Sequence, residues 1–184
     1  MARSGNGLAD EGKTWALGTR YLCQKNAMNV LVITLMLIMS QFKNQQVTNA
    51  NTMETQSIQV VQEFLTAVQQ GNKAKLAAII HLNIQWDQPG TNRFSGTKKS
   101  SAEVFQMVGG MFQATDNSLA LTDIKTLTAN GNRVACLIHW KAVQPNGGIL
   151  DVDNIDVYTV ENGKIVQATV YSADIAQEDN FWLK

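Results

Sequence analysis

The chain has 184 residues, its 15 Lys and Arg are balanced by 15 Asp and Glu, and 45% of its residues are hydrophobic. This length is enough for one domain with a proper core, and the balanced charge gives no argument for nucleic-acid binding or for disorder. The two cysteines, Cys23 and Cys136, belong to no spaced Cys/His set, so we expect neither a metal site nor a cofactor.

The first distinctive segment is residues 29–39, NVLVITLMLIM, which is nearly all apolar. It is too short to span a bilayer comfortably. It matches the hydrophobic region of a secretory signal, with Arg20 and Lys25 before it and Thr48 and Ala50 as a cleavage site. A short membrane-anchoring or core helix is the alternative interpretation.

Residues 1–50 are therefore predicted to be a leader and linker, and the polar stretch 40–52 to be the linker itself. We expect export to the periplasm or out of the cell, with a cytoplasmic location as the alternative. The mature domain, residues 51–184, would then have no membrane segment, and Cys136 would be its only cysteine.

Two helices are predicted next. Residues 53–70 carry apolar side chains three and four positions apart, which form one helix face. Asn51 and Glu54 resemble a capping box at its start, and Gly71 suits its end. Residues 73–80, KAKLAAII, predict a short second helix.

A strand, Leu82–Trp86, follows and ends in Asp87 before the chain-breaking pair Pro89-Gly90. Ser100 and Glu103 then form a second capping box. Apolar residues at helical spacing follow that box: Val104, Phe105, Val108, Met111 and Phe112.

From residue 118 onward the pattern predicts an antiparallel meander. Three hairpin signals, Asn130-Gly131, PNGG at 145–148 and Asn162-Gly163, separate four strands near residues 119–128, 132–143, 149–160 and 164–172. Helices before a meander predict an α+β fold with the helices packed on one sheet face. Because two strands are long, we expect a strongly curved antiparallel sheet with the N-terminal helices on its concave face, a cone-shaped α+β barrel with an interior pocket.

Alternation along the strands assigns side chains to this pocket. In 132–143 the inward set is predicted to be Val134, Cys136, Ile138, Trp140 and Ala142. In 149–160 the even positions place Asp156 on a mostly apolar face with Tyr158. A buried carboxylate is unfavourable unless paired or neutral, so Asp156 is either functional or a hydrogen-bonded structural residue. By alternation alone, Asp87 is a turn residue that bonds its own backbone.

The order of elements resembles that of the SnoaL-like and ketosteroid-isomerase-like families of the nuclear transport factor 2-like superfamily. The similarity covers about residues 54–183 and is carried by WDQPGTNRFSG, NIDVYTVENGKIV and YSADIAQEDNFW. In the isomerases a general base precedes a Ser-Gly pair by a fixed interval, and that position is Asp87 here. Their neutral, donating carboxyl lies in an Ile-Asp pair, which here is Ile155-Asp156. Their catalytic phenol corresponds to Phe64, which has no hydroxyl, so the standard steroid isomerisation is in doubt.

The resemblance implies a pocket for a hydrophobic small molecule and a homodimer formed through the outer sheet face near His139. One hypothesis is an isomerase- or cyclase-type enzyme that transfers a proton on a hydrophobic carbonyl or cyclic substrate, with Asp87 as base and Asp156 as neutral donor. The alternative is a non-catalytic binding protein, and an interaction module on the sheet surface has the least support. The candidate ligand-binding residues are Phe64, Trp86, Cys136, Ile138, Trp140, Tyr158 and Ser172.

Overall fold

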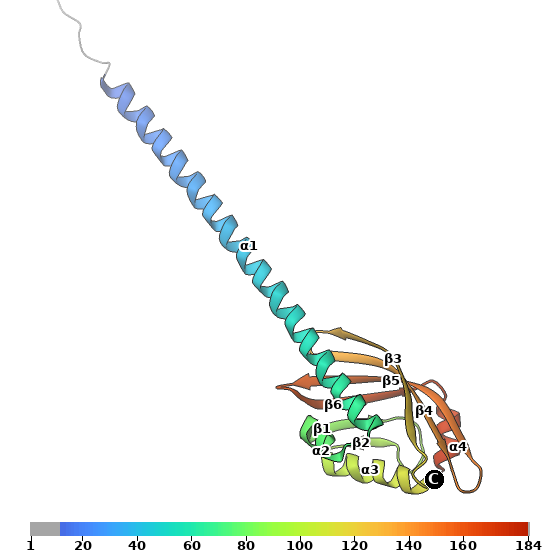
Figure 1. Ribbon diagram of the computed structural model, residues 1–184. Helices are drawn as coiled ribbons and strands as arrows, with labels where there is room; N and C mark the ends of the chain where they lie inside the picture. The colour runs from blue at the N-terminus through green and yellow to red at the C-terminus, as the bar shows by residue number, and fades with distance from the viewer. Residues whose placement is uncertain (1–11, 184) are drawn as a thin grey trace, which may run out of the picture. The chain divides into compact units, whose positions relative to one another are not determined.

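The computed structural model describes residues 12–183, which form helix α1 (Gly12–Gln69) and the elements after it (Figure 1). The chain divides into two compact units, residues 1–48 and residues 49–184. Helix α1 contributes to both units, and every other helix and strand lies in the second.

The first unit is helical where it is described. The predicted linker, residues 40–52, lies within α1, because this polar stretch contains no proline or glycine to end a helix. Between residues 32 and 39 the large apolar side chains are exposed, from 45% at Val32 to 70% at Met39. Among the described residues, no helix is long and apolar enough to cross a membrane.

The predicted leader begins before the described part of the chain, because residues 1–11 lie outside it. The side chains of its basic flank, Arg20 and Lys25, and of its cleavage site, Thr48 and Ala50, are also outside the described set. Export therefore stays a prediction.

The second unit contains the end of α1, α2 (Lys73–Ile79), α3 (Ser101–Ala114) and α4 (Ile175–Trp182). The capping box of α3 is confirmed: Ser100 Oγ accepts from the Glu103 amide at 3.2 Å, and Glu103 Oε2 accepts from the Lys99 amide at 2.8 Å. The box predicted at Asn51 is wrong, because α1 continues through it. Glu54 Oε1 instead accepts from the Gly131 amide at 3.0 Å, so this carboxylate joins α1 to a hairpin turn.

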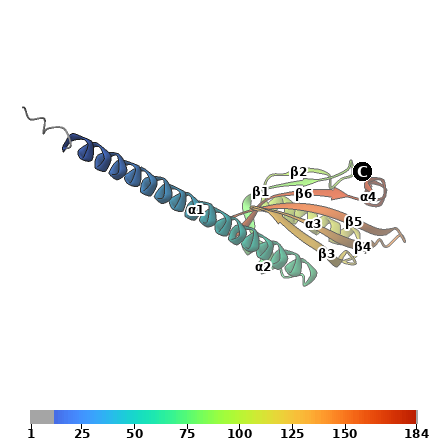
Figure 2. The ribbon, with the colours of Figure 1, turned by 90° about the horizontal axis from the view of Figure 1, so that it is seen from above.

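The sheet has six strands in the order β2-β1-β6-β5-β4-β3. Their bounds are β1 (Ile80–Gln88), β2 (Gly96–Lys98), β3 (Ala120–Asn130), β4 (Arg133–Val143), β5 (Ile149–Glu161) and β6 (Lys164–Ser172). The α+β class is confirmed, and Figures 1 and 2 show the helices and the long, bent strands. The sheet differs from the predicted barrel in two respects. First, the sheet stays open, with β2 and β3 as its edge strands. Second, the sheet is not purely antiparallel, because β1 pairs in parallel with β6 while all other strand pairs are antiparallel.

The predicted strand faces of β4 and β5 are confirmed by burial. Val134, Cys136 and Ile138 on β4 are at most 1% exposed. The even positions of β5, from Leu150 to Val160, are all buried, and Asp156 is 3% exposed among them. The core therefore lies between this sheet face and the buried side chains of α1 and α3.

The opposite face of the sheet carries a charged cluster around His139. Its Nε2 lies 2.8 Å from Asp151 Oδ1 and its Nδ1 contacts Asp153 Oδ1 at 2.5 Å. Lys141 and Lys125 pair with the same two aspartates, and these partners hold the pKa of both carboxyls below its ordinary value. Homodimer formation through this face stays a prediction.

Candidate functional site

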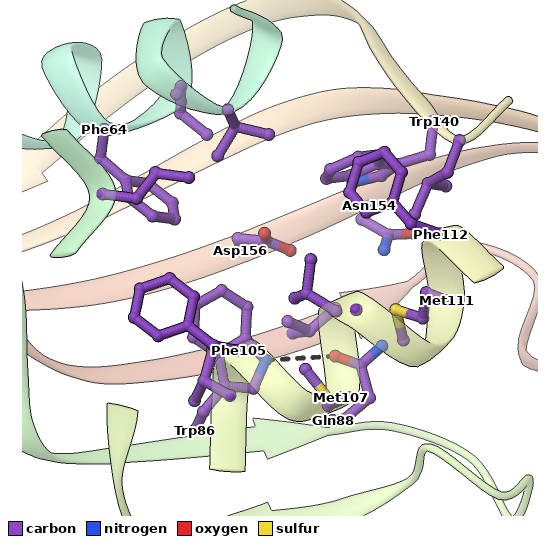
Figure 3. Close-up of a pocket in the computed structure, with 18 of the residues that line it drawn as sticks. Phe64, Trp86, Gln88, Phe105, Met107, Met111, Phe112, Trp140, Asn154 and Asp156 are labelled. Carbon is purple, nitrogen blue, oxygen red and sulfur yellow. Dashed lines mark hydrogen bonds between the residues drawn. The ribbon is translucent and has the colours of Figure 1, made fainter. Parts of the chain in front are cut away.

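A cavity of about 810 Å³ opens between the sheet and helices α1, α2 and α3. Its walls are mainly apolar and aromatic, as expected of a small-molecule site. Figure 3 shows Phe64, Trp86 and Phe105 at one end of the cavity and Trp140 and Phe112 at the other. The methionines of α3, Met107 and Met111, also line it, and their flexible thioethers can adapt to a ligand.

Asp156 is the polar group at the centre of this apolar cavity (Figure 3). Alternation along β5 turns its side chain inward, and its Oδ2 accepts from the Tyr158 hydroxyl at 2.8 Å. Its Oδ1 is buried and has no hydrogen-bond partner among the described residues. Burial and, to a smaller extent, the negative charge of Glu178 together raise the pKa of Asp156 to about 7, against the lowering effect of the hydrogen bond from Tyr158.

Two aromatic rings, those of Phe64 and Trp86, pack against Tyr158, which is the hydrogen-bond partner of Asp156. The ring of Tyr158 packs edge-on against Phe64, with centroids 5.3 Å apart, and against Trp86 at 6.0 Å. Tyr158 is 1% exposed, and burial raises the pKa of its hydroxyl well above the ordinary value. The phenol therefore stays protonated and keeps donating to Oδ2 of Asp156, while Oδ1 has no hydrogen-bond partner among the described residues.

A second carboxyl, Glu178 on α4, also lines the cavity and is 4% exposed. Burial raises its pKa, while hydrogen bonds from Ser172 and Asn154 lower it. With its amide nitrogen turned toward α4, Asn154 donates to Glu178 Oε1 at 3.2 Å. Glu178 was not among the predicted site residues, because the strand alternation that assigned side chains to the pocket does not extend to α4. The spacing of Glu178 with Phe181 and Trp182 in ADIAQEDNFW was the available signal, since all three side chains are buried on α4.

Asp87, the predicted base, is not brought to the cavity. Its neighbours Trp86 and Gln88 line the cavity, so alternation along β1 directs Asp87 to the other face. There its Oδ1 accepts from the Thr97 hydroxyl at 2.6 Å and its Oδ2 from Gln85 Nε2 at 3.3 Å. The predicted convergence of Asp87 and Asp156 is therefore wrong. The count back from Gly96 finds the strand end but does not set which face the side chain takes.

The remaining predicted ligand-binding residues fall into two groups. Four of them line the cavity: Phe64, Trp86, Trp140 and Tyr158. The other three do not. Cys136 and Ile138 are buried in the core, and Ser172 bonds Glu178 behind the wall. Cys136 faces Asp156 across the β4–β5 pair, and its Sγ contacts the Asp156 carbonyl at 3.5 Å. Burial raises the pKa of this thiol to about 12, which disfavours the thiolate that a nucleophile requires.

Among the described residues, no group of three or more His, Cys, Asp or Glu side chains could hold a metal ion. The polar side chains that line the cavity include carboxyls, a phenol and amides, which are groups that can form hydrogen bonds. The second unit is thus an α+β domain with a mainly apolar cavity and a buried carboxyl at the centre of that cavity.

The chain belongs to the SnoaL-like domain family, whose model matches residues 61–168. A protein of unknown function with a cystatin-like fold from Xanthomonas campestris is 34% identical, with a TM-score of 0.67, over 70% of this chain and 98% of that one. The fold is also similar to that of a nuclear transport factor 2-like protein from Burkholderia xenovorans LB400, which is 19% identical with a TM-score of 0.62, over 71% of this chain and 98% of that one.

A third solved structure, a candidate SnoaL-like polyketide cyclase from Jannaschia sp. CCS1, is 14% identical with a TM-score of 0.59, over 72% of this chain and 95% of that one. No curated protein matches the chain. The resemblance to the SnoaL-like and nuclear transport factor 2-like proteins is thus confirmed, and the likenesses below 25% identity establish the fold alone.

Proposed function

We propose that this SnoaL-like domain binds a largely apolar small molecule and that Asp156, in its neutral form, donates a hydrogen bond from Oδ1 to a carbonyl oxygen of that molecule. The proposal rests on one observation: Asp156, a residue that is 3% exposed, lines an apolar cavity, and its Oδ1 has no hydrogen-bond partner among the described residues. A buried polar group without a partner is unfavourable, so a ligand that supplies one gains binding energy there.

Tyr158 determines which oxygen carries the proton. Because its hydroxyl donates to Oδ2, the proton of a neutral Asp156 belongs on Oδ1, where it points at the ligand. With the pKa raised to about 7, the neutral and ionised forms coexist near neutral pH. The donor is therefore present below about pH 7 and is lost as the pH rises above it.

Two aromatic probes of the same shape can test this, 9-fluorenone and fluorene, because only fluorenone has a carbonyl. We expect Asp156→Ala to weaken fluorenone binding at least about tenfold, or about 1.4 kcal/mol. Asp156→Asn keeps a donor and should bind fluorenone nearly as well as the wild type. Fluorescence or calorimetric titration at pH 6 measures these affinities.

Fluorene provides the control, because its affinity depends on the cavity and not on a donor. All three proteins should bind it equally, which shows that the cavity is intact in each variant. Wild-type affinity for fluorenone should fall above pH 7, and that of Asp156→Asn should not. Equal fluorenone affinity in the wild type and Asp156→Ala would refute the proposed role of Asp156.

A second candidate function, proton transfer on a hydrophobic carbonyl compound, is favoured by the pKa of about 7. A carboxyl that titrates near neutral pH can both take and give a proton. Glu178 is the other carboxyl of the cavity, so this version replaces the predicted base Asp87 by the pair Asp156 and Glu178. The candidate cyclase from Jannaschia, which has the same fold, is consistent with such chemistry.

Exchange of the α-protons of 2-indanone in D₂O, followed by proton NMR, tests this version. We expect the wild type to accelerate the exchange and Asp156→Asn, which cannot transfer a proton, to lose that acceleration. Asp87→Asn should exchange at the wild-type rate, because Asp87 lies on the other face of β1. If the wild type leaves the exchange at the rate of buffer alone while fluorenone binds as above, the domain is a binding protein.

A further inference from the structure

Gln88, at the end of β1, presents an amide to the cavity in a fixed orientation. Its Oε1 accepts from the Trp86 indole Nε1 at 3.1 Å, which is the dashed line in Figure 3. An amide whose oxygen is held in this way must direct its NH₂ group elsewhere, and Gln88 lines the cavity. Among the described residues, no acceptor is within hydrogen-bond distance of this NH₂ group.

The register of the sheet places Gln88 in line with Asp156. Ala168 on β6 lies between Trp86 on β1 and Tyr158 on β5. Two residues further along β6, Val170 pairs with Asp156, and the same parallel register places Gln88 on its other side.

Two strand spacings, about 9.5 Å, therefore separate the backbones of Gln88 and Asp156. Gln88, Asp156 and Val170 all line the cavity, and Val170 lies on the strand between the other two. A ligand oxygen that lies over Val170 has a donor on each side of it.

We infer that Gln88 is the second hydrogen-bond donor of the site and that the amide, fixed by Trp86, donates to the same ligand oxygen as Asp156. This inference rests on the proposed function. It makes the preferred ligand a flat apolar compound whose carbonyl oxygen accepts two hydrogen bonds, one from a neutral carboxyl and one from an amide. Trp86 acts as a positioning residue, because its indole decides which end of the Gln88 amide faces the ligand.

The test uses the full chain and the fluorenone–fluorene pair at pH 6. Gln88→Leu removes the donor at similar size, and we expect about tenfold weaker binding of fluorenone with unchanged binding of fluorene. Gln88→Glu keeps an acceptor for the Trp86 indole and also lacks the NH₂ group. The glutamate variant should bind fluorenone about as weakly as Gln88→Leu does. It tests the inference even if the leucine variant fails to fold. Gln85→Leu, on the outer face of the same strand, is the matched control and should change neither affinity.

A double variant, Gln88→Leu with Asp156→Ala, then tests whether the two donors share one oxygen. If they do, the second substitution has less effect on fluorenone in the presence of the first than alone. Equal fluorenone affinity in the wild type and Gln88→Leu would overturn the inference about Gln88, and if Asp156→Ala still weakens binding the proposed function survives. If neither substitution changes fluorenone binding, the proposed function fails as well.

Discussion

Replacing Asp156 with asparagine is expected to make the protein increasingly stable relative to the wild type as the pH rises from 5 to 8. Burial raises the pKa of this carboxyl from 3.8 to about 7 in the folded protein. A carboxyl with a raised folded-state pKa favours folding below its unfolded pKa, and that contribution is lost as the pH rises through the folded pKa. By this linkage the wild type loses roughly 2–3 kcal/mol between pH 5 and pH 8 that the asparagine variant does not lose.

Urea unfolding of both proteins at several pH values measures the difference. The asparagine oxygen can still accept from the Tyr158 hydroxyl, so the substitution keeps the hydrogen bond that anchors the pair. Asp87→Asn is the matched control, because that carboxyl is only half-buried and bonded to Thr97 on the outer face. It should show no such gain with rising pH. If the free energies of unfolding of the wild type and Asp156→Asn changed equally with pH, the fold would not favour a neutral Asp156.

The sequence predicted the second unit well, because its signals are local. Asn162-Gly163 has positive φ at both residues, 50° and 73°, as a type I′ hairpin turn requires. Alternation placed Cys136 and Asp156 on the inner face correctly, because the pairing of β4 with β5 runs without a register shift. The helix predicted for α1 was too short, because local signals are missing from the segment before it. A polar stretch without proline or glycine has no local signal that ends a helix, and composition alone does not separate it from a linker.

The site was only partly predictable, because it depends on contacts between distant segments. Asp156 could be found from one strand, where a carboxyl stands among apolar residues. Glu178 could not be assigned to the cavity from a single strand in this way, since its burial depends on α4 packing against β5. Gln88 could not either, because its role comes from the β1–β6–β5 register, in which β1 runs parallel to β6. For Asp87 the error was different. Counting along the sequence gave its position at the strand end but not its sheet face, and the side chain lies on the face away from the cavity.

The second large effect is expected at Gly90, in the loop between β1 and β2. This residue has φ of +84°, in the region that favours glycine, and a Cβ added there would lie 2.2 Å from Asp179 Oδ1. That oxygen cannot move freely, since it accepts from the Thr91 amide and from Asn92 Nδ2, each at 2.8 Å. These hydrogen bonds lower the pKa of Asp179, which shows that its ionised form is the one the loop holds.

Asp179 joins two of the three stretches that carry the family resemblance, WDQPGTNRFSG and YSADIAQEDNFW. The same contact fixes α4, which places Glu178 and Trp182 in the cavity wall. Phe94 of the loop packs edge-on against Trp182, with ring centroids 5.3 Å apart. These stretches therefore specify how the end of the cavity is closed, and this explains why they indicate the fold without indicating the reaction.

Gly90→Ala should consequently lower the melting temperature much more than Gly147→Ala. Gly147 has a similar φ of +90°, but a Cβ there meets nothing within 4 Å, so its substitution measures the backbone strain alone, about 1–2 kcal/mol. At Gly90 the same strain is joined by displacement of the Asp179 carboxylate from the Thr91 and Asn92 donors. In an Asp179→Ala background the excess over Gly147→Ala should largely disappear, because the colliding oxygen is gone. Equal melting temperatures for Gly90→Ala and Gly147→Ala in the wild-type background would show that the loop yields to the methyl group and that Asp179 does not hold α4 in place.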